Sequence, residues 1–337
     1  MKNADLNEVN RPNIHIFNSF RTQFGGSEQE ALSLAAMLSE QAEVSLWASS
    51  SRACPSLMSK HNIKHIDVFK KDSRPNGGTY IFVGCHWRNK LWPYLISRPS
   101  RLINIYNTFH PKHVELTQKS PLLLKWPTTE YVLISHFQKH QLNLNAQVFP
   151  SPINLNHFKP SKVTPTSTSV IHVGRMSRDT LDKHNLDDIK VYRWLADKKI
   201  KVLLQGATCL QHNMTPQENI TLLESGHIEA KSFLSNLDIF YYRSGAHVET
   251  FGRVIFEAMA CGVPVVAENR GGYTDWIKHG KNGFLFDTTQ EAIAYLDRLI
   301  SDDALRNEMA TEALKTVHDM YGDKAKAAQI SYYLRGQ

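Results

Sequence analysis

Short apolar runs alternate with helical patterns along the whole chain. In the first half, "IHIFNSF", "EVSLWAS", "TYIFVG", "LINIYN" and "EYVLIS" are predicted strands, and "GSEQEALSLAAMLSEQ" places Ala31, Leu34 and Leu38 at helical spacing. In the second half, "SVIHVG", "KVLLQG", "ITLL", "DIFYY" and "VPVVA" are predicted strands, separated by helices such as Leu186–Asp197 and Gln290–Ile300. This alternation is typical of α/β domains with parallel sheets and crossover helices.

Prolines interrupt the pattern at Pro150, Pro152, Pro160 and Pro165, in a stretch rich in Ser, Thr and Asn that indicates a linker. A length of 337 residues also favours two domains. We therefore expect one domain over residues 1–155, a second over 156–315, and a C-terminal helix over 316–337 that packs back on the first domain. Ligands of open α/β sheets bind at the carboxyl ends of the strands, so two such domains predict a central cleft.

The composition is that of an ordinary folded protein, with 42% hydrophobic and 21% charged residues. Its four cysteines show neither metal-ligand spacing nor a disulfide framework, which favours a reducing compartment. The polar start lacks a signal-peptide core, and no apolar run approaches the roughly 20 residues of a membrane helix. We therefore expect a cytoplasmic protein.

Positive charge is concentrated in the first half of the chain. Residues 1–160 contain 18 Lys and Arg against 10 Asp and Glu, whereas the remainder contains 21 against 22. A basic half indicates an acidic partner, such as an anionic membrane surface, a nucleic acid or a phosphorylated acceptor, unless the charge serves solubility alone. We expect peripheral association with the inner membrane face through this half.

The stretch "HVETFGRVIFEAMACGVPVV" places two carboxylates around the start of a helix. Glu249 lies in the loop after the predicted strand "DIFYY", and Glu257 lies on the helix that follows. Gly262 suits the position after the helix, and Pro264 prevents its continuation. Both carboxylates can face a ligand, and carboxylates bind paired sugar hydroxyls well. On spacing alone, a solvated Glu257 and a Glu249 favoured by the helix dipole are equally good interpretations.

Two further elements have the chemistry to contact phosphate. Gly25 and Gly26 follow the first predicted strand and precede a helix, where backbone N–H groups bind anions. A lone Gly-Gly is a weak signal, and it is not the G-x-G-x-x-G of dinucleotide-binding dehydrogenases. Arg175 and Lys183 follow the first strand of the second half in "HVGRMSRDTLDK". They have the charge to neutralise a diphosphate, although such cations are also common on surfaces.

Together these motifs resemble the retaining family 4 glycosyltransferases of the GT-B fold. The two glutamates and "EAMACGVPVV", followed by "RGGYTDWIKHGKNGFLF", are similar to the family signature, and the similarity is most specific over residues 238–287. Gly25–Gly26, "NTFH", "YVLISHFQ", "VFPSPINLNHFKP", "HVGR" and "NLDIFYY" match more loosely. The resemblance implies two Rossmann-like parallel-sheet domains that face a central cleft, the first on the acceptor side and the second binding the donor.

The resemblance also implies roles for residues of the second half. Glu257 would bind the nucleotide ribose, and the base would stack near Glu224–Ile228. Glu249 would bind the donor sugar, helped by the backbone N–H groups of Thr250, Phe251 and Gly252.

The same resemblance places a cationic site beside the sugar. Arg175 and Lys183 would bind the diphosphate, together with the backbone of Gly25 and Gly26. His110 would lie near the reacting carbon, so the implied catalytic residues are Glu249, His110 and Arg175. The spacing from Arg175 to Lys183 is longer than is usual in the family, and the short first half implies reduced acceptor-binding loops.

The expected activity is retaining, metal-independent transfer of a hexosyl group from a nucleotide-diphosphate sugar to a glycan or lipid-linked acceptor, in cell-surface polysaccharide biosynthesis. No Asp-x-Asp motif occurs, and no cofactor is expected. Another GT-B-type nucleotide-sugar enzyme, an epimerase or a phosphorylase, is the first alternative, although no cofactor lysine site is found. A non-enzymatic nucleic-acid binder is the second, but no reading motif accompanies the basic half, and no nucleic-acid partner is expected.

Overall fold

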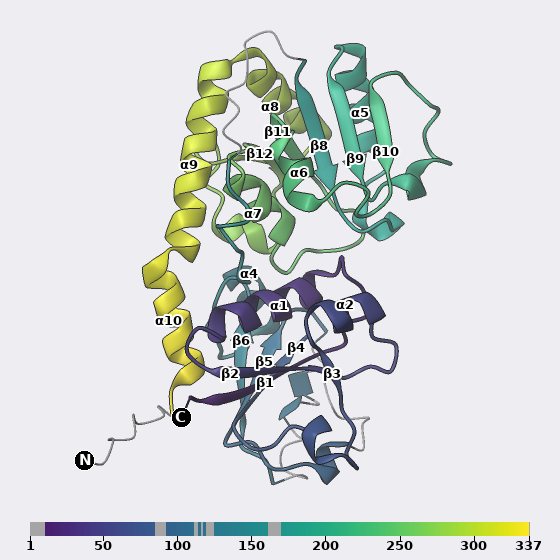
Figure 1. The fold of residues 1–337 in the computed structure, drawn as a ribbon. Coiled ribbons are helices and arrows are strands. Elements are labelled where there is room, and N and C mark those ends of the chain that lie inside the picture. Colours follow the sequence, from purple (N-terminus) through teal and green to yellow (C-terminus); the bar gives the residue numbers. More distant parts are fainter. Residues whose placement is uncertain are drawn as a thin grey trace, which may run out of the picture. The chain divides into compact units, whose positions relative to one another are not determined.

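The computed structural model describes residues 11–84, 92–110, 114–115, 117–118, 125–160 and 170–336. Its contacts divide the chain into two compact units (Figure 1). The first unit contains the described residues of 1–23, 27–132 and 326–337, and the second contains residues 24–26 and 133–325.

The division falls after Val132, earlier in the chain than the boundary at residue 155 that the prolines suggested. Residues beyond Val132 are hydrogen-bonded within the second unit, because Ser135 Oγ donates to the carbonyl of Thr250 at 2.6 Å. Arg253 similarly donates to the carbonyl of Pro152 at 2.6 Å. The proline-rich stretch therefore packs with the second unit as far as residue 160, and Pro165 lies outside the described residues.

The first sheet has seven strands in the order β3-β2-β1-β4-β5-β6-β7, of which β1 to β5 lie in the first unit, β6 ends at its boundary and β7 lies beyond it in the chain. The pairs that join β3, β2, β1, β4 and β5 are parallel. The strands are β1 (Asn13–Asn18), β2 (Glu43–Ala48), β3 (Lys64–His65), β4 (Thr79–Val83), β5 (Arg101–Tyr106), β6 (Thr129–Leu133) and β7 (Gln147–Val148). The helices of this unit include α1 (Gly26–Leu38), α2 (Pro55–Lys60) and the short 3₁₀ turns η1 (Lys71–Ser73) and η2 (Trp92–Leu95). Helix α4 (His136–Leu142) follows β6 and belongs to the second unit.

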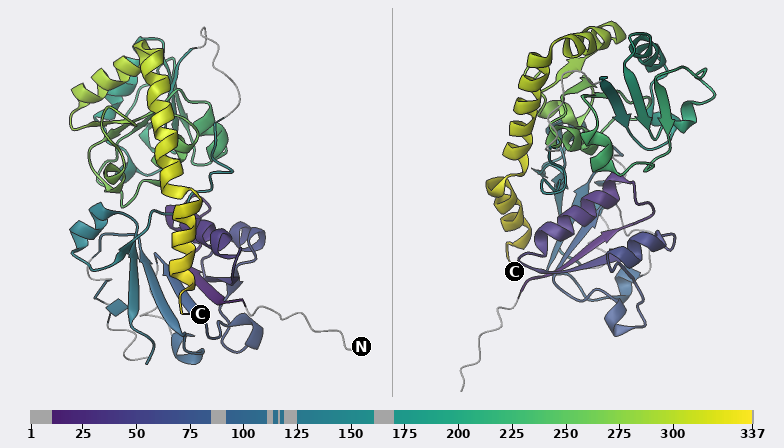
Figure 2. Two further views of the ribbon diagram at one scale, coloured as in Figure 1. Left: turned by 90° about the vertical axis from the view of Figure 1, so that its left-hand side faces the viewer. Right: turned by 45° about the horizontal axis from the view of Figure 1, so that its top comes forward.

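The second unit is built on a six-stranded sheet with the order β10-β9-β8-β11-β12-β13, in which all pairs are parallel. Its strands are β8 (His172–Met176), β9 (Lys201–Gln205), β10 (Ile220–Leu223), β11 (Ile239–Tyr242), β12 (Val265–Glu268) and β13 (Phe284–Phe286). Its helices are α5 (Asp188–Asp197), α6 (Ala230–Ser235), α7 (Arg253–Ala260), α8 (Thr289–Ser301) and α9 (Asp303–Tyr321), with the turns η3 (Leu181–Lys183), η4 (Thr208–Leu210) and η5 (Gly272–Asp275). Figure 2 shows the long helix α9, which packs on α7 and α8.

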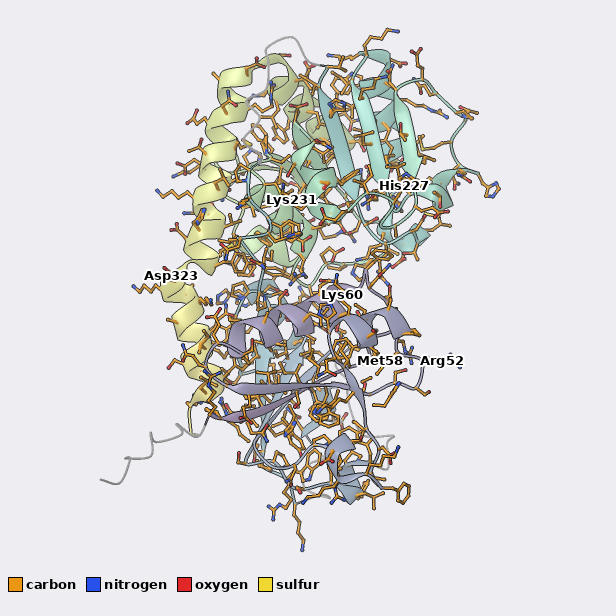
Figure 3. The ribbon with its side chains drawn as sticks, viewed as in Figure 1. Arg52, Met58, Lys60, His227, Lys231 and Asp323 are labelled. Atoms are coloured by element: carbon orange, nitrogen blue, oxygen red, sulfur yellow. The ribbon has the colours of Figure 1, made fainter. Side chains whose placement is uncertain are left out.

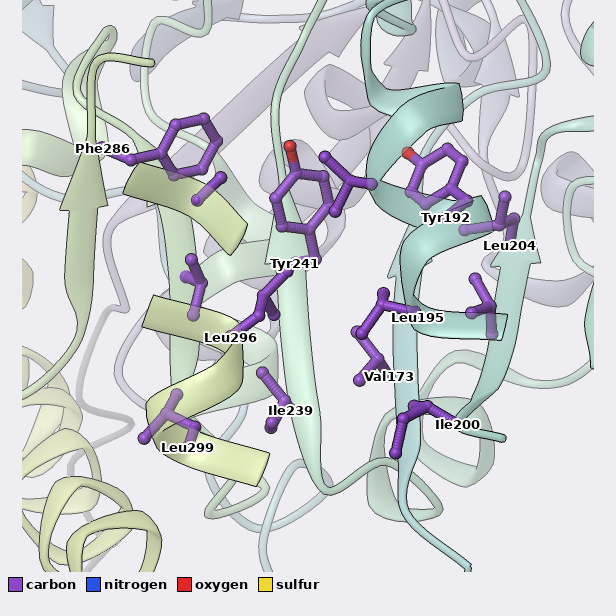
Figure 4. Packing of buried hydrophobic residues seen from close by; sticks show 14 of the residues in the cluster. Val173, Tyr192, Leu195, Ile200, Leu204, Ile239, Tyr241, Phe286, Leu296 and Leu299 are labelled. Carbon is purple, nitrogen blue, oxygen red and sulfur yellow. The ribbon is translucent and has the colours of Figure 1, made fainter. Parts of the chain in front are cut away.

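Each sheet has its own apolar core. Alternate residues of β11 face opposite sides, so that Ile239 and Tyr241 pack with Leu195 of α5 and Leu296 of α8 (Figure 4), whereas Tyr242 points to the other side. The core of the first unit is mostly aromatic and contains Phe17, Trp47, Tyr80, Phe82, Leu102 and Trp126. These cores fix the carboxyl ends of the strands, where ligand-binding loops begin.

Every strand that the apolar runs predict is present, and both parallel sheets are confirmed. The short strands β3, β7 and β13 were not predicted. The last helix, α10 (Asp323–Leu334), ends in the first unit, where Arg101 binds Glu130 at 2.7 Å and donates to the carbonyl of Tyr332. Within the described ranges, no helix combines the length and the apolar character needed to cross a membrane.

Candidate functional site

The loop after β11 carries Glu249 and is shaped by a glycine at the start of α7. Gly252 precedes the helix with a φ of 84°, a left-handed conformation that side chains other than glycine rarely adopt. A Cβ atom at this position would lie 2.7 Å from Tyr273 Cδ1. The loop therefore turns tightly and leaves Glu249 at the carboxyl end of the strand, as the sequence predicts.

The carboxylate of Glu249 is bound by the side chains of Lys183, Tyr242 and His247, and we call these four residues the Glu249 cluster. Lys183 Nζ lies 2.6 Å from Glu249 Oε1, and the Tyr242 hydroxyl donates to the same oxygen at 2.5 Å. His247 Nε2 lies 3.6 Å from Oε2. The side chains of Lys183 and Glu249 are only 9% and 13% exposed. Glu249 is thus fixed in one orientation.

The charges of the Glu249 cluster set the ionisation of Glu249. Burial alone would raise the pKa of Glu249, but Lys183 and His247 outweigh it and hold that pKa well below its ordinary value. Burial lowers the pKa of Lys183, and Glu249 opposes that change. Burial raises the pKa of Tyr242 well above its usual range, so its hydroxyl stays protonated and donates. Glu249 is therefore a buried carboxylate that stays ionised at neutral pH.

Two further loops hold the Glu249 loop from outside. The N–H of His247 donates to the carbonyl of Asp182 at 3.0 Å, which joins the loops of Lys183 and Glu249. The N–H of Gly272 donates to the carbonyl of Glu249 at 2.9 Å. A Cβ atom on Gly272 would lie 1.9 Å from the carbonyl oxygen of Thr250, so only glycine permits this approach.

Arg175 is completely buried beneath the Glu249 cluster. Its guanidinium donates to the carbonyl of Arg243 at 2.5 Å and to the carbonyl of Lys183, and it lies 5.1 Å from the ring centre of Tyr242. The sequence predicts an Arg175 that grips phosphate directly, whereas these contacts make it a support for the Lys183 loop and for Tyr242. The prediction that it binds phosphate stays a prediction.

A buried ionic network lies around Arg175 and was not predicted. Asp188, at the start of α5, is 3.9 Å from Arg175 and 3.4 Å from Arg243, and it accepts from the Tyr241 hydroxyl at 2.7 Å. Burial raises the pKa of Asp188 to about 6, against the opposing charge of Arg175. The sequence shows Asp188 only as a helix start, and nothing in its spacing reveals its partners.

Glu257 lies apart from the Glu249 cluster, on α7, where its Oε1 atom is 3.4 Å from Arg253. Its side chain is 12% exposed, and burial raises the pKa of Glu257, against the pull of Arg253. Arg253 also donates to Ser151 Oγ at 2.8 Å and to the carbonyl of Pro152. Glu257 is thus a largely buried carboxylate fixed by one cation.

The segment expected to meet the nucleotide base is held by one side chain. Gln205 Nε2 donates to the carbonyl of Ile228 at 3.0 Å, and the N–H of Ile228 donates to Gln205 Oε1 at 2.7 Å. Next to it, His157 Nε2 lies 3.0 Å from Oε1 of Glu229, the residue that caps α6. The main chain of Ile228 is therefore occupied by Gln205, which sequence inspection did not single out.

Three predicted residues follow strands of the first sheet. Gly25 is buried, Gly26 is exposed at the first position of α1, and both follow β1. His110 is exposed after β5, and its carbonyl accepts from the Tyr106 hydroxyl. Of the predicted residues, the structure brings Arg175, Lys183 and Glu249 together, and it places Glu257 and Ile228 on neighbouring elements of the same unit.

Comparison with known proteins identifies this architecture. The model of the family "Glycosyl transferases group 1" matches residues 208–316. The capsular polysaccharide biosynthesis glycosyltransferase CapM of Staphylococcus aureus is 25% identical over 163 residues, 45% of this chain and 42% of that protein. A GDP-mannose-dependent alpha-mannosyltransferase of Corynebacterium glutamicum is 34% identical over 110 residues, 32% of this chain and 26% of that protein. The chain thus spans less than half the length of these curated relatives.

The fold is also that of solved glycosyltransferase structures. HepE of Anabaena, in complex with UDP-glucose, superimposes with a TM-score of 0.71 at 17% sequence identity, over 97% of this chain and 100% of that one. Two Rossmann-like units with parallel sheets of this kind define a GT-B protein. Residues 208–316 match the family of the glycosyl transferases group 1, and the resemblance of the two-glutamate motif points to the same family.

Proposed function

We propose that the chain is a retaining glycosyltransferase that moves a sugar from a nucleotide-diphosphate donor to a glycan or lipid-linked acceptor. The observation that supports this most is the ionised, buried carboxylate of Glu249 at the carboxyl end of β11, followed by Glu257 on the next helix. In this proposal, Glu249 accepts hydrogen bonds from donor-sugar hydroxyls, and Glu257 accepts them from the ribose.

The start of α7 supplies donors for the same sugar. In the described part of the chain, the N–H groups of Phe251 and Gly252 donate to no protein acceptor, although both residues are buried. Such N–H groups at a helix start bind oxygen atoms of a ligand. Thr250 contributes to the loop through its carbonyl, which accepts from Ser135. Removing one preorganised donor of this kind typically lowers turnover about 10²- to 10³-fold.

The developing charge of the diphosphate is met by protein cations in this proposal. Lys183 is the nearest cation to Glu249, and Arg175 fixes the carbonyl of Lys183 from below. Gly25 and Gly26 add backbone N–H groups at the start of α1. Transfer is therefore proposed to be independent of divalent metal ions. Activity in excess EDTA checks this directly, and activity lost in EDTA and restored by magnesium would contradict it.

Retention is proposed because Glu249 is the one carboxylate that we assign to the donor sugar. Glu249 is engaged by Lys183 and Tyr242, so it is poorly suited to attack a sugar carbon. Departure of the diphosphate and attack of the acceptor on the same face would retain the anomeric configuration without a second carboxylate. His110 is proposed to lie near the reacting carbon. The configuration of the first product, read by proton NMR, tests the proposal.

The acceptor is proposed to be a glycan of the cell surface, because the relative CapM is named for capsular polysaccharide biosynthesis. A panel of nucleotide sugars, screened by thermal shift and then by transfer to oligosaccharides, is the decisive experiment. An enzyme that isomerised a nucleotide sugar without transfer would be an epimerase, and one that cleaved a glycan with inorganic phosphate would be a phosphorylase. A chain that bound generic DNA but no nucleotide sugar would be a nucleic-acid binder.

Association with an anionic membrane surface is a further part of the proposal. Phe69 is 93% exposed, between β3 and β4, and it is followed by Lys70, Lys71 and Arg74. An exposed aromatic ring beside cations suits the interface of an anionic bilayer. This surface belongs to the basic first half, and it would bring the enzyme to a lipid-linked acceptor on the cytoplasmic face.

A further inference from the structure

We propose that Arg21 and Arg52 form a binding site for an oxyanion, a phosphate or a carboxylate, on the saccharide acceptor. The site lies in the first unit, in the loops that follow β1 and β2. This inference rests on the proposed function, in which the first unit binds the acceptor.

The two loops form one rigid piece. The N–H of Ser49 donates to the carbonyl of Asn18 at 2.9 Å, and the N–H of Cys54 donates to the carbonyl of Phe20 at 2.7 Å. Phe20 itself is fully buried with a φ of 47°, a left-handed conformation that is unusual for a large residue. Its N–H donates to Asn18 Oδ1 at 2.8 Å. Strained backbone that is fixed in this way is concentrated at binding sites.

Arg21 is held by hydrogen bonds of its main-chain N–H and of its side-chain Nε atom. Its N–H donates to Oε1 of the buried Glu28 at 3.2 Å, and its Nε atom donates to Ser50 Oγ at 3.3 Å. The same Ser50 Oγ accepts from the N–H of Arg52 at 3.1 Å. Ser50 is 8% exposed, so this shared hydroxyl is a fixed point. The guanidinium of Arg21 is therefore placed beside the main chain of Arg52 before any ligand arrives.

Both guanidinium groups lack an anionic partner. Within the described residues, Arg52 and the terminal nitrogens of Arg21 contact no acceptor, and both residues are exposed. The carboxylate of Glu28 lies beneath the loop, 6% exposed, and makes no ion pair with Arg21. Elsewhere in this unit, Arg101 is matched by Glu130 at 2.7 Å. The joined loops thus carry two cations without a counter-charge, and an oxyanion would supply one.

These arginines lie at the edge of the sheet where open α/β folds bind their ligands. They follow β1 and β2, and the strand order reverses between β1 and β4, which is where open α/β sheets bind ligands. A planar guanidinium binds two oxygens of a phosphate or carboxylate at once. Lys60 of α2 is also exposed and adds positive charge to the same group of elements, as Figure 3 shows with Arg52 and Met58. The chemistry therefore favours an anionic saccharide over a neutral one.

The test compares two double variants of the full chain. Arg21→Gln/Arg52→Gln removes the site, and Arg11→Gln/Arg98→Gln removes the same charge from exposed positions before β1 and before β5. Calorimetric titration with glucose, glucose 6-phosphate and glucuronate measures the recognition of the oxyanion. We expect the first variant to bind both anionic probes about tenfold or more weakly, because hydrogen bonds to charged groups are lost. The control variant should bind them as the wild type does.

The other outcomes are decisive against the proposal. Equal affinities of the three proteins for the anionic probes, or no binding of them by the wild type, would overturn it. A variant that lost affinity for UDP instead would show that the arginines serve the donor. A variant that lost only its binding to phosphatidylglycerol vesicles would show that they serve a lipid surface. If the wild type bound the anionic sugars but no nucleotide, the proposed function would fail and the oxyanion site would stand.

Discussion

The ammonium nitrogen of Lys183 lies 2.6 Å from Oε1 of Glu249, and both side chains are almost completely buried. The Tyr242 hydroxyl donates to the same carboxylate oxygen at 2.5 Å. Glu249 thus has two donors on one oxygen, while its second oxygen faces His247 at 3.6 Å. The arrangement keeps Glu249 charged in a place where burial would otherwise favour the neutral form.

Replacing Lys183 by methionine should lower turnover about a hundredfold, because a preorganised cation is lost. The pKa of Glu249 should rise in the variant, since Lys183 is the strongest of the groups that lower it. The acid limb of turnover against pH should therefore move to higher pH. Lys190→Met, at an exposed ion pair with Asp187 on α5, is the control. An unchanged pH profile of Lys183→Met would show that the pair does not set the charge of Glu249.

Glu257→Ala and Glu249→Ala should differ in the step that they impair. Glu257→Ala should weaken nucleotide binding about tenfold or more, since a hydrogen bond from a hydroxyl to a charged carboxylate is worth roughly 1.5–3 kcal/mol. Glu249→Ala should chiefly lower turnover, because its carboxylate lies in the loop that we assign to the sugar. Calorimetric titration of UDP and steady-state kinetics measure the two effects. Wild-type values for both variants would contradict the site.

Arg175→Ala should reduce the stability of the fold as well as the activity. Its removal takes one of two cations from the buried Asp188 and leaves only Arg243 beside it among the described residues. Breaking a buried pair completely typically costs about 3–5 kcal/mol, which is the upper limit expected here. Urea unfolding measures the change in the free energy of unfolding. Turnover per folded molecule should also fall, because Arg175 holds the carbonyl of Lys183. A variant with both wild-type stability and wild-type turnover would refute both roles.

His15 should make the protein less stable as the pH falls from about 6.5 to 4. Its Nδ1 atom accepts from Trp47 Nε1 at 2.9 Å, and burial, with help from Lys64, lowers the pKa of His15 to about 4. The unfolded chain binds this proton below about pH 6.5 and the folded chain only below about 4, so folding is opposed in that window. The free energy of unfolding should fall by at most about 3 kcal/mol through His15. His15→Gln, unfolded by urea at several pH values, should lack this dependence, and an equal dependence would exclude His15 as its source.

Phe69→Ser should weaken binding to phosphatidylglycerol vesicles about tenfold, because burial of a phenylalanine side chain is worth roughly 1.5–3 kcal/mol. Flotation at low salt measures it, and added salt should weaken the wild type further. The control is Val170→Ser in the second unit, where Val170 is 51% exposed. If Phe69→Ser bound vesicles as strongly as the wild type, any membrane contact would lie elsewhere.

Both sheets and the Glu249 loop were predictable because they depend on local patterns. Apolar runs predict strands, and Gly262 and Pro264 mark the end of α7. The Glu249 cluster was predictable only in part, since Tyr242 meets Glu249 through the alternation of β11 and a tight loop. Asp188 and Gln205 could not be predicted, because their partners are distant in sequence and become neighbours only when the strands are paired. The burial of Arg175 could not be predicted for the same reason.

The closeness of Gly272 to the carbonyl of Thr250 restricts how this loop can be re-engineered. The loop at residues 249–252 and the turn at Gly271–Gly272 are separate in the sequence, but the main chain of each fits closely against the other. A donor loop taken from another transferase and inserted at residues 249–252 would bring its own main-chain path, and the native turn at Gly271–Gly272 would fit it only by chance. Exchange of specificity between members of this group should therefore succeed when both segments are transplanted together and fail when either is moved alone.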